Sequence, residues 1–171
     1  MRAAFPAVLA ALVVAVFAPV PAAAGPAAAD PPAAGSWTAP LPGHLAVARP
    51  FEAPAHAYGP GHRGADLGGA AGTPVLASGD GVVVFAGMVA GRPVVSIDHA
   101  DGLRTTYEPV DPAVGAGQQV ARGSPIGALV TGHAGCPVEA CLHWGLRRGE
   151  AYLDPLLLLV VRVRLLPLRG R

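Results

Sequence analysis

Two histidines and one aspartate form a set that could bind a metal ion. His62 and Asp66 are four residues apart in a segment with glycines at 61 and 64, and His143 follows much later in the chain. An imidazole and a carboxylate at this spacing can reach one ion if the backbone turns between them, and glycine makes such a turn easier. Two histidines and a carboxylate are a common catalytic zinc set that leaves a fourth position for water. The residues alone leave a second interpretation open, in which His143 is a hydrogen-bonded core residue.

Short β-rich runs must position these three residues. Gly, Pro and Asp separate the runs, and no stretch in this part of the chain has a helical period. We expect the segment that contains His62 and Asp66 to be a turn ahead of the first strands. The spacing of the runs predicts an antiparallel all-β domain. The expected strands are residues 73–77, 82–85, 93–97, 103–107, 118–120, 126–130 and 142–146.

The composition is that of a globular protein. The chain has 171 residues, of which 52% are hydrophobic and 13% are charged, and this length allows one domain of ordinary size. Its 12 basic and 11 acidic residues give a net charge of +1, without a long run of one sign. This balance argues against a nucleic-acid partner held by charge and against a highly charged disordered chain.

The N-terminus has the layout of a secretory signal peptide. Arg2 precedes an apolar run over residues 7–17, prolines break the run, and small residues at 22–24 offer a cleavage position. About eleven apolar residues are too few for a membrane-spanning helix. We therefore expect export, with residues 1–24 removed after Ala24 and no stable membrane span left after cleavage.

The segments that flank the domain are expected to be a linker and a tail. Residues 25–45 are rich in Pro and Ala and lack a hydrophobic period, which predicts a linker before a domain over residues 46–160. The apolar run at 156–161 is interrupted by arginines at 162 and 164. It predicts a buried strand or a short helix, followed by a basic and apolar tail over residues 161–171.

Several passages resemble one family. Residues 62–68, 72–75 and 81–84 are similar to the opening of the lysostaphin/LytM-type zinc metallopeptidases, the murein endopeptidases that include β-lytic metallopeptidase. Residues 142–147, with 152–155, resemble the closing motif, and residues 117–127 match a glycine-rich hairpin of the family. The resemblance covers residues 45–160 in the right order. It implies an antiparallel β fold with an open, barrel-like groove (a duplicated hybrid motif), and a Zn²⁺ ion bound by His62, Asp66 and His143.

Two catalytic histidines of the family are absent from this chain. The late family motif is HxH, and Cys141 stands at its first position here. The other catalytic histidine follows a tyrosine by two residues, and Pro109 stands there in this chain. The resemblance therefore implies that the metal ligands are kept and that two polar groups beside the metal are lost.

Glu108 and His133 are the candidates for replacing the missing catalytic groups. Glu108 adjoins one vacated position and is a chemically suitable general base. In a strand its side chain points away from the face of Tyr107 and Pro109, so the alternative is a solvent-facing acid. His133 lies on a loop from which it could reach the metal, and the alternative is a flexible surface histidine.

The two cysteines are expected to form a disulfide. Cys136 and Cys141 are the only cysteines of a chain expected to be exported, and pairing is then the default. The rival interpretation makes Cys141 a zinc thiolate, because residues at i and i+2 of a strand share a face.

These expectations define three hypotheses for a single-domain protein at the cell envelope. In the first, the chain is a zinc metalloendopeptidase that cuts the cross-bridge peptides of peptidoglycan, and the family resemblance favours this enzyme. In the second, it is a catalytically degenerate module that binds wall peptides or regulates a partner hydrolase. The third is a structural β domain without a metal.

Overall fold

Antiparallel strands dominate the part of the chain that the computed structural model describes, residues 36–56 and 59–160. The predicted signal peptide, residues 25–35 of the predicted linker, and the predicted tail lie outside these residues. The described residues contain two short 3-10 helices, η1 (Ala100–Gly102) and η2 (Pro155–Leu159). The strands are β1 (Ala46–Arg49), β2 (Gly64–Gly69), β3 (Pro74–Leu76), β4 (Gly81–Val89), β5 (Arg92–Asp98), β6 (Leu103–Glu108), β7 (Val110–Pro112), β8 (Gln119–Val120), β9 (Pro125–Leu129), β10 (Ala140–Arg148) and β11 (Ala151–Leu153). The all-β, antiparallel prediction is confirmed.

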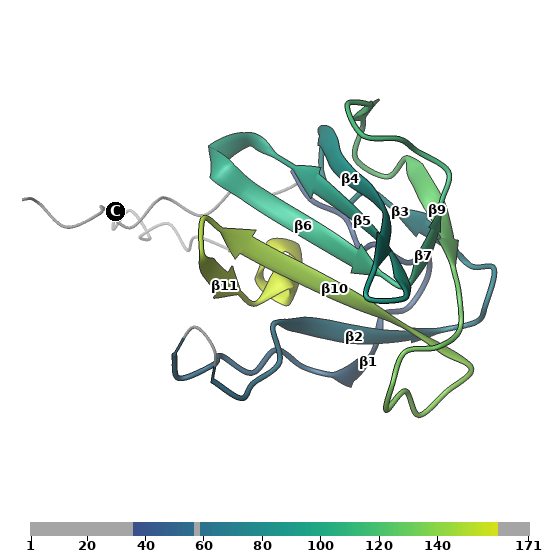
Figure 1. Cartoon of the computed structure of the whole chain (residues 1–171), viewed down its shortest axis with the longest axis vertical. Helices are drawn as coiled ribbons and strands as arrows, with labels where there is room; N and C mark the ends of the chain where they lie inside the picture. Colours follow the sequence, from purple (N-terminus) through teal and green to yellow (C-terminus); the bar gives the residue numbers. More distant parts are fainter. Residues whose placement is uncertain (1–35, 57–58, 161–171) are drawn as a thin grey trace, which may run out of the picture. The chain divides into compact units, whose positions relative to one another are not determined.

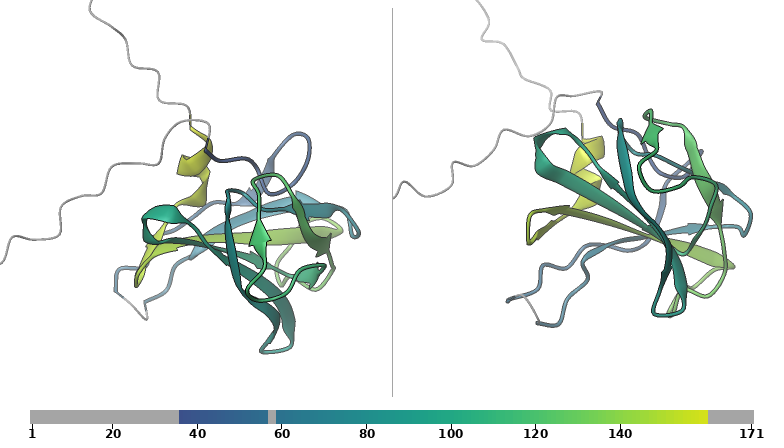
Figure 2. Two further views of the ribbon diagram at one scale, coloured as in Figure 1. Left: turned by 90° about the horizontal axis from the view of Figure 1, so that it is seen from above. Right: turned by 45° about the horizontal axis from the view of Figure 1, so that its top comes forward.

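The strands form two sheets (Figure 1). The larger sheet has the order β1-β2-β10-β6-β5-β4-β8, and β11 also pairs with β10. The smaller sheet has the order β3-β9-β7. Two further views show how strongly the larger sheet twists between β10 and β4 (Figure 2), in keeping with the usual twist between neighbouring strands. In this order β10 lies between β2 and β6, so three segments far apart in the sequence become neighbours.

Strand β2 corrects the expectation of a turn around Asp66. Its sequence, GADLGG, has little β propensity, yet it pairs with β1 on one side and with β10 on the other. Hydrogen bonding on both edges outweighs the weak preference of glycine for strands, because β propensity depends strongly on context. Asp66 is thereby fixed inside a sheet, and only His62 lies in the loop before it.

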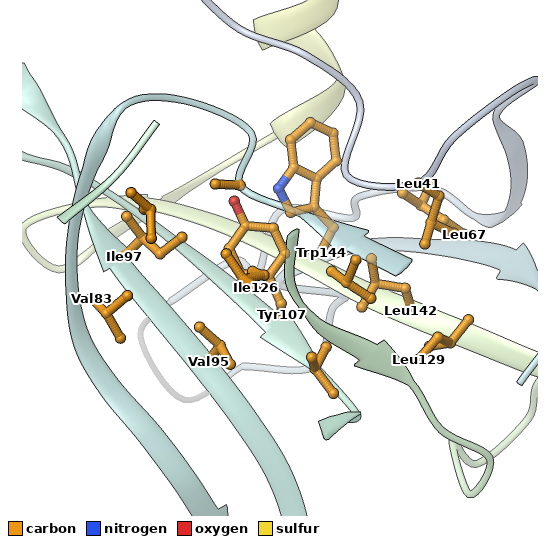
Figure 3. Close-up of a cluster of buried hydrophobic side chains, with 14 of the residues drawn as sticks. Leu41, Leu67, Val83, Val95, Ile97, Tyr107, Ile126, Leu129, Leu142 and Trp144 are labelled. Atoms are coloured by element: carbon orange, nitrogen blue, oxygen red, sulfur yellow. The ribbon is translucent and has the colours of Figure 1, made fainter. Parts of the chain in front are cut away.

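The core lies between the two sheets. Large side chains of β6 and β10, among them Tyr107, Leu142 and Trp144, pack with Ile126 and Leu129 of the smaller sheet (Figure 3). Because side chains alternate along a strand, residues 141, 143 and 145 of β10 face the other side of the larger sheet. The core interpretation of His143 is therefore wrong.

Chain segments at both ends of the domain pack onto this core. Leu41 is buried in it, and backbone N–H groups of Thr38 and Leu76 donate to the carbonyls of Ser78 and Pro40, both at 2.8 Å. The packed domain thus begins before residue 46. Leu156, Leu158 and Leu159 of η2 also contact the core, which fits the short-helix alternative for the run at 156–161. No helix within the described residues is long and apolar enough to span a bilayer.

Candidate metal centre

Three neighbouring strands place three polar residues side by side. His143 of β10 is directly opposite Asp66 of β2 and directly opposite Glu108 of β6. Residues opposed across antiparallel strands share a face, with Cβ atoms about 4.5–5.5 Å apart. Asp66, His143 and Glu108 therefore form a row on the face that does not carry the core.

The loop before β2 adds His62 to this row. A two-way backbone bridge fixes the residue: Glu52 N–H donates to the His62 carbonyl at 3.0 Å, and His62 N–H donates to the Glu52 carbonyl at 2.8 Å. The ring Nδ1 lies 2.7 Å from the carbonyl oxygen of Pro50. A carbonyl only accepts, so Nδ1 carries the proton and Nε2 is left to face the other two residues.

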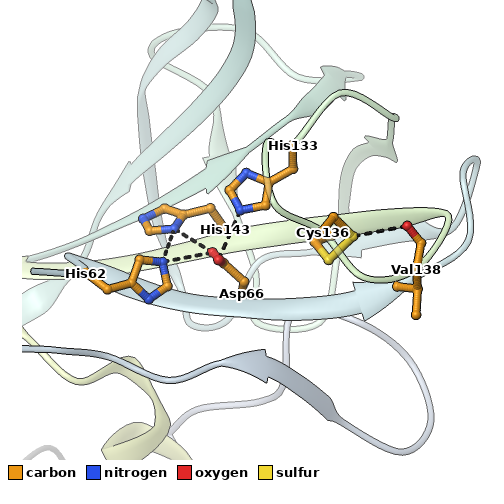
Figure 4. The surroundings of a disulfide bond; sticks show 7 residues. His62, Asp66, His133, Cys136, Val138 and His143 are labelled. Atoms are coloured by element: carbon orange, nitrogen blue, oxygen red, sulfur yellow. Dashed lines mark hydrogen bonds and ion pairs between the residues drawn. A yellow bond between two sulfur atoms is a disulfide. The ribbon is translucent and has the colours of Figure 1, made fainter.

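The facing atoms of His62, Asp66 and His143 converge (Figure 4). His62 Nε2 lies 3.0 Å from Asp66 Oδ1, His143 Nδ1 lies 2.8 Å from the same oxygen, and the two nitrogens are 3.1 Å apart. Tetrahedral zinc with bond lengths of about 2.0–2.1 Å keeps its ligand atoms about 3.3 Å apart. The triangle needs only a small expansion to hold zinc.

The facing atoms of His62 and Asp66 also require a positive charge between them. With the proton of neutral His62 on Nδ1, the lone pair of Nε2 faces a carboxylate oxygen at 3.0 Å, and both atoms are acceptors. Two buried acceptors at that distance are favourable only with a positive charge between them, which a proton or a metal ion can supply. The residues therefore fit the zinc that the family resemblance implies.

Asp66 is kept ionised inside this cluster. Burial alone would raise the pKa of its carboxyl. Hydrogen bonds from His143 and His133 outweigh burial and hold the pKa of Asp66 well below its ordinary value. An ionised carboxylate among imidazole rings is a ready ligand for a divalent metal.

His133 reaches the centre, which corrects the interpretation of it as a surface histidine. Its Nε2 lies 3.0 Å from Asp66 Oδ2, and its side chain is only 14% exposed. It therefore contacts the carboxylate oxygen that His62 and His143 leave free (Figure 4).

Glu108 is not the solvent-facing acid of the alternative interpretation. Its side chain is 16% exposed, and Oε1 lies 2.7 Å from Arg92 Nε. It points away from the core face of Tyr107, as expected, but that direction leads to the face of the metal cluster because the next strand places His143 there.

The two positions where the family has catalytic histidines hold no imidazole here. Cys141 is buried and forms a disulfide with Cys136, which confirms the predicted pairing and rules out a thiolate ligand. Pro109 is buried after a cis peptide bond. Hydrogen-bond donors from these two side chains are therefore lacking.

Three groups that support the centre were missed by the sequence interpretation: the carbonyl of Pro50, the guanidinium of Arg92, and the bare Cα of Gly64. A Cβ added at residue 64 would lie 2.5 Å from the Trp144 carbonyl oxygen and 2.7 Å from His143 Nε2. The glycines at 61 and 64 predict a turn, whereas in the structure Gly64 lies in β2 and makes room for the His143 ring.

Replacing Gly64 with alanine should therefore displace His143 and weaken metal binding. Both contacts are far below van der Waals distance, and one of them is to backbone, so the strand or the ring must move. We expect zinc affinity to fall by about tenfold or more, the range for disturbed metal supports. Chelator competition measures this, with Gly68→Ala, whose nearest neighbour is 3.2 Å away at the flexible Val138 side chain, as the matched control. Equal affinity in both variants would contradict the role of Gly64.

The fold and this cluster define a metallopeptidase-type β domain. The family model of Peptidase family M23 matches residues 60–155, and the chain belongs to this family. The lysostaphin/LytM-type resemblance is thereby confirmed.

The chain is also similar to individual relatives and to solved structures. The uncharacterized protein Rv2891 of Mycobacterium tuberculosis is 51% identical over 150 residues, a match that covers 85% of this chain and 59% of the relative. The chain thus spans about three fifths of that relative's length. The solution structure of lysostaphin is similar with a TM-score of 0.55 and 26% identity, over 67% of this chain and 50% of lysostaphin. A SpoIIQ–SpoIIIAH complex contains a chain similar with a TM-score of 0.59 and 25% identity, over 70% of this chain and 97% of that one.

Proposed function

We propose that this protein is a zinc metalloendopeptidase that cleaves cross-bridge peptides of peptidoglycan, at a rate well below that of a domain with both family histidines. The observation that carries the proposal is the convergence of His62 Nε2, Asp66 Oδ1 and His143 Nδ1 within 3.1 Å of one another. Membership of the peptidase family and the similarity to lysostaphin support the substrate class.

The residues of the cluster would have separate roles in such a reaction. His62, Asp66 and His143 would hold the metal, which when bound acidifies water and polarises a peptide carbonyl. Glu108 lies next to His143 on the same face, and its carboxylate would accept the proton of the attacking water. Arg92 holds this carboxylate through the ion pair at 2.7 Å.

The reduced rate follows from positions 109 and 141. Neither Pro109 nor the disulfide-bonded Cys141 can donate a hydrogen bond to the oxygen that gains negative charge. Removal of one such donor typically lowers turnover by about 100- to 1,000-fold. Loss of two coupled donors costs less than the product of the single effects.

We propose the cell envelope as the place of action. The sequence pattern of residues 1–24 is that of an export signal, and a disulfide is stable in an oxidising compartment. Peptidoglycan peptides are found in that compartment, so the location and the proposed substrate agree.

A second candidate function is a binding or regulatory module. The absence of both histidines favours it, and so does the similarity to a chain in a SpoIIQ–SpoIIIAH complex. Such a module would keep its affinity for wall peptides or for a partner hydrolase without turnover.

Dye release from labelled sacculi separates the two candidates. With the zinc-loaded protein we expect slow release above the blank, and the blank is His62→Ala, which lacks one proposed ligand. Sedimentation with unlabelled sacculi measures binding in parallel. Binding with no release above the blank would favour the module, and the absence of both would overturn both candidates.

A further inference from the structure

The loop between β9 and β10 brings a histidine to the metal cluster that the family motifs do not include. His133 Nε2 lies 3.0 Å from Asp66 Oδ2, and a carboxylate oxygen only accepts, so Nε2–H donates. The other oxygen, Oδ1, faces His62 and His143 at 3.0 and 2.8 Å. The two oxygens of Asp66 therefore have separate partners. Oδ2 accepts a hydrogen bond from His133, and Oδ1 points to the proposed metal site.

A disulfide ties this loop to the strand that carries His143. Cys136 lies three residues after His133, and the Cys136 N–H donates to the His133 carbonyl at 3.4 Å. Cys136 is bonded to Cys141 of β10, two residues before His143 and on the same face of the sheet. The covalent bond therefore connects the His133 turn to the metal-binding strand over a very short path (Figure 4).

The backbone on both sides of His133 borders open space. Gly132 and Gly135 flank His133 with φ angles of +107° and +80°, and a Cβ added at either glycine would meet nothing within 4 Å. Ala134 is exposed between them. A turn that is open to solvent on both sides of a largely buried ring needs an anchor, and Cys136–Cys141 supplies one.

We propose that His133 is a positioning residue for Asp66 and that the Cys136–Cys141 disulfide holds His133 in this position. By donating a hydrogen bond to Oδ2, His133 keeps Oδ1 directed at the metal site between His62 and His143. The cysteine at 141, where the family resemblance has a histidine, thus brings a different histidine to the centre. This inference rests on the zinc centre of the proposed function, but it does not depend on turnover.

Zinc affinity tests this inference without any assay of activity. Hydrogen-bond partners of metal ligands typically contribute about 10- to 100-fold to metal affinity. In competition with a fluorescent chelator, we expect His133→Ala to bind zinc about 10- to 100-fold more weakly than the wild-type protein made in an oxidising compartment. His133→Gln should recover most of the loss, because its amide N–H can also donate to Oδ2. His44→Ala, which removes an exposed histidine, should bind as tightly as the wild type.

The disulfide is tested by a mutant cycle. Cys136→Ala/Cys141→Ala should weaken zinc binding by a similar factor, and adding His133→Ala to it should cost little more, because the two changes act through one contact. Thermal unfolding of the metal-free proteins checks that each variant folds. If the cysteine variant does not fold, the comparison of His133→Ala with His133→Gln decides alone.

The results that would contradict this inference are not the same as those that would contradict the proposed function. Wild-type affinity in His133→Ala, no recovery in His133→Gln, or independent losses in the cycle would overturn the positioning role and leave the zinc centre intact. A wild-type protein with no affinity for zinc would overturn both.

Discussion

Replacing His143 with alanine should reduce the zinc content of the purified protein from about one ion per chain to near zero. The change removes one of three atoms that lie within 3.1 Å of one another, and leaves Asp66 and His62 as two ligands. Two protein ligands rarely hold zinc against dialysis, since catalytic sites use three. Elemental analysis after dialysis against a mild chelator measures the effect.

The matched control for His143→Ala is His44→Ala, because it removes an exposed imidazole outside the cluster. We expect this variant to keep its zinc. Asp66→Asn should lose zinc as His143→Ala does, since it removes the charge that the surrounding imidazoles stabilise. Near-zero zinc in the wild type, or equal zinc in wild type and His143→Ala, would refute the assignment of the ligands.

Strands with β-branched residues were predictable from local sequence. The runs Val82–Phe85 and Pro93–Ile97 lie within β4 and β5, because β-branched and aromatic residues bounded by Gly, Pro and Asp favour strands. Strands β1, β2, β7 and β11 were not predicted. Each is short or rich in glycine and proline, and each is a strand because a neighbour pairs with it.

The three proposed ligands could be chosen from the sequence because the family motifs carry them. The structure adds how they meet: β2 and β10 set Asp66 opposite His143, and the Pro50 carbonyl orients His62. Every residue has a backbone carbonyl, so the contact between His62 and the Pro50 carbonyl could not be predicted from the residue types.

The positions of His133 and Glu108 depend on tertiary structure. His133 and Asp66 are far apart in sequence, and their contact requires the β9–β10 loop to fold back over the sheet. The cysteine pattern held a usable signal, because a disulfide from 136 to 141 ties that loop to the strand of His143. For Glu108 the alternation rule gave the correct face, but the sheet order decided that this face carries the cluster.

Replacing Glu108 with glutamine should lower the turnover of peptide hydrolysis by about 100- to 10,000-fold, the usual contribution of a general base. Glutamine keeps the size of the side chain and removes its ability to accept a proton at neutral pH. Zinc content should stay at the wild-type level, because Glu108 does not belong to the converging triangle. Single-turnover dye release at high protein concentration makes the comparison possible even if the wild type is slow.

The ion pair of Glu108 provides the control that separates proton transfer from structure. Arg92→Gln breaks the same 2.7 Å contact and keeps the carboxylate, and Arg92 is half exposed, so the lost pair is worth at most about 1 kcal/mol. We expect a loss of activity of no more than about fivefold in this variant, which corresponds to that energy. Equal losses in Glu108→Gln and Arg92→Gln would show that the ion pair matters and the base does not. Wild-type turnover in Glu108→Gln would remove Glu108 from the reaction, and the proton would then have to leave the attacking water by another route.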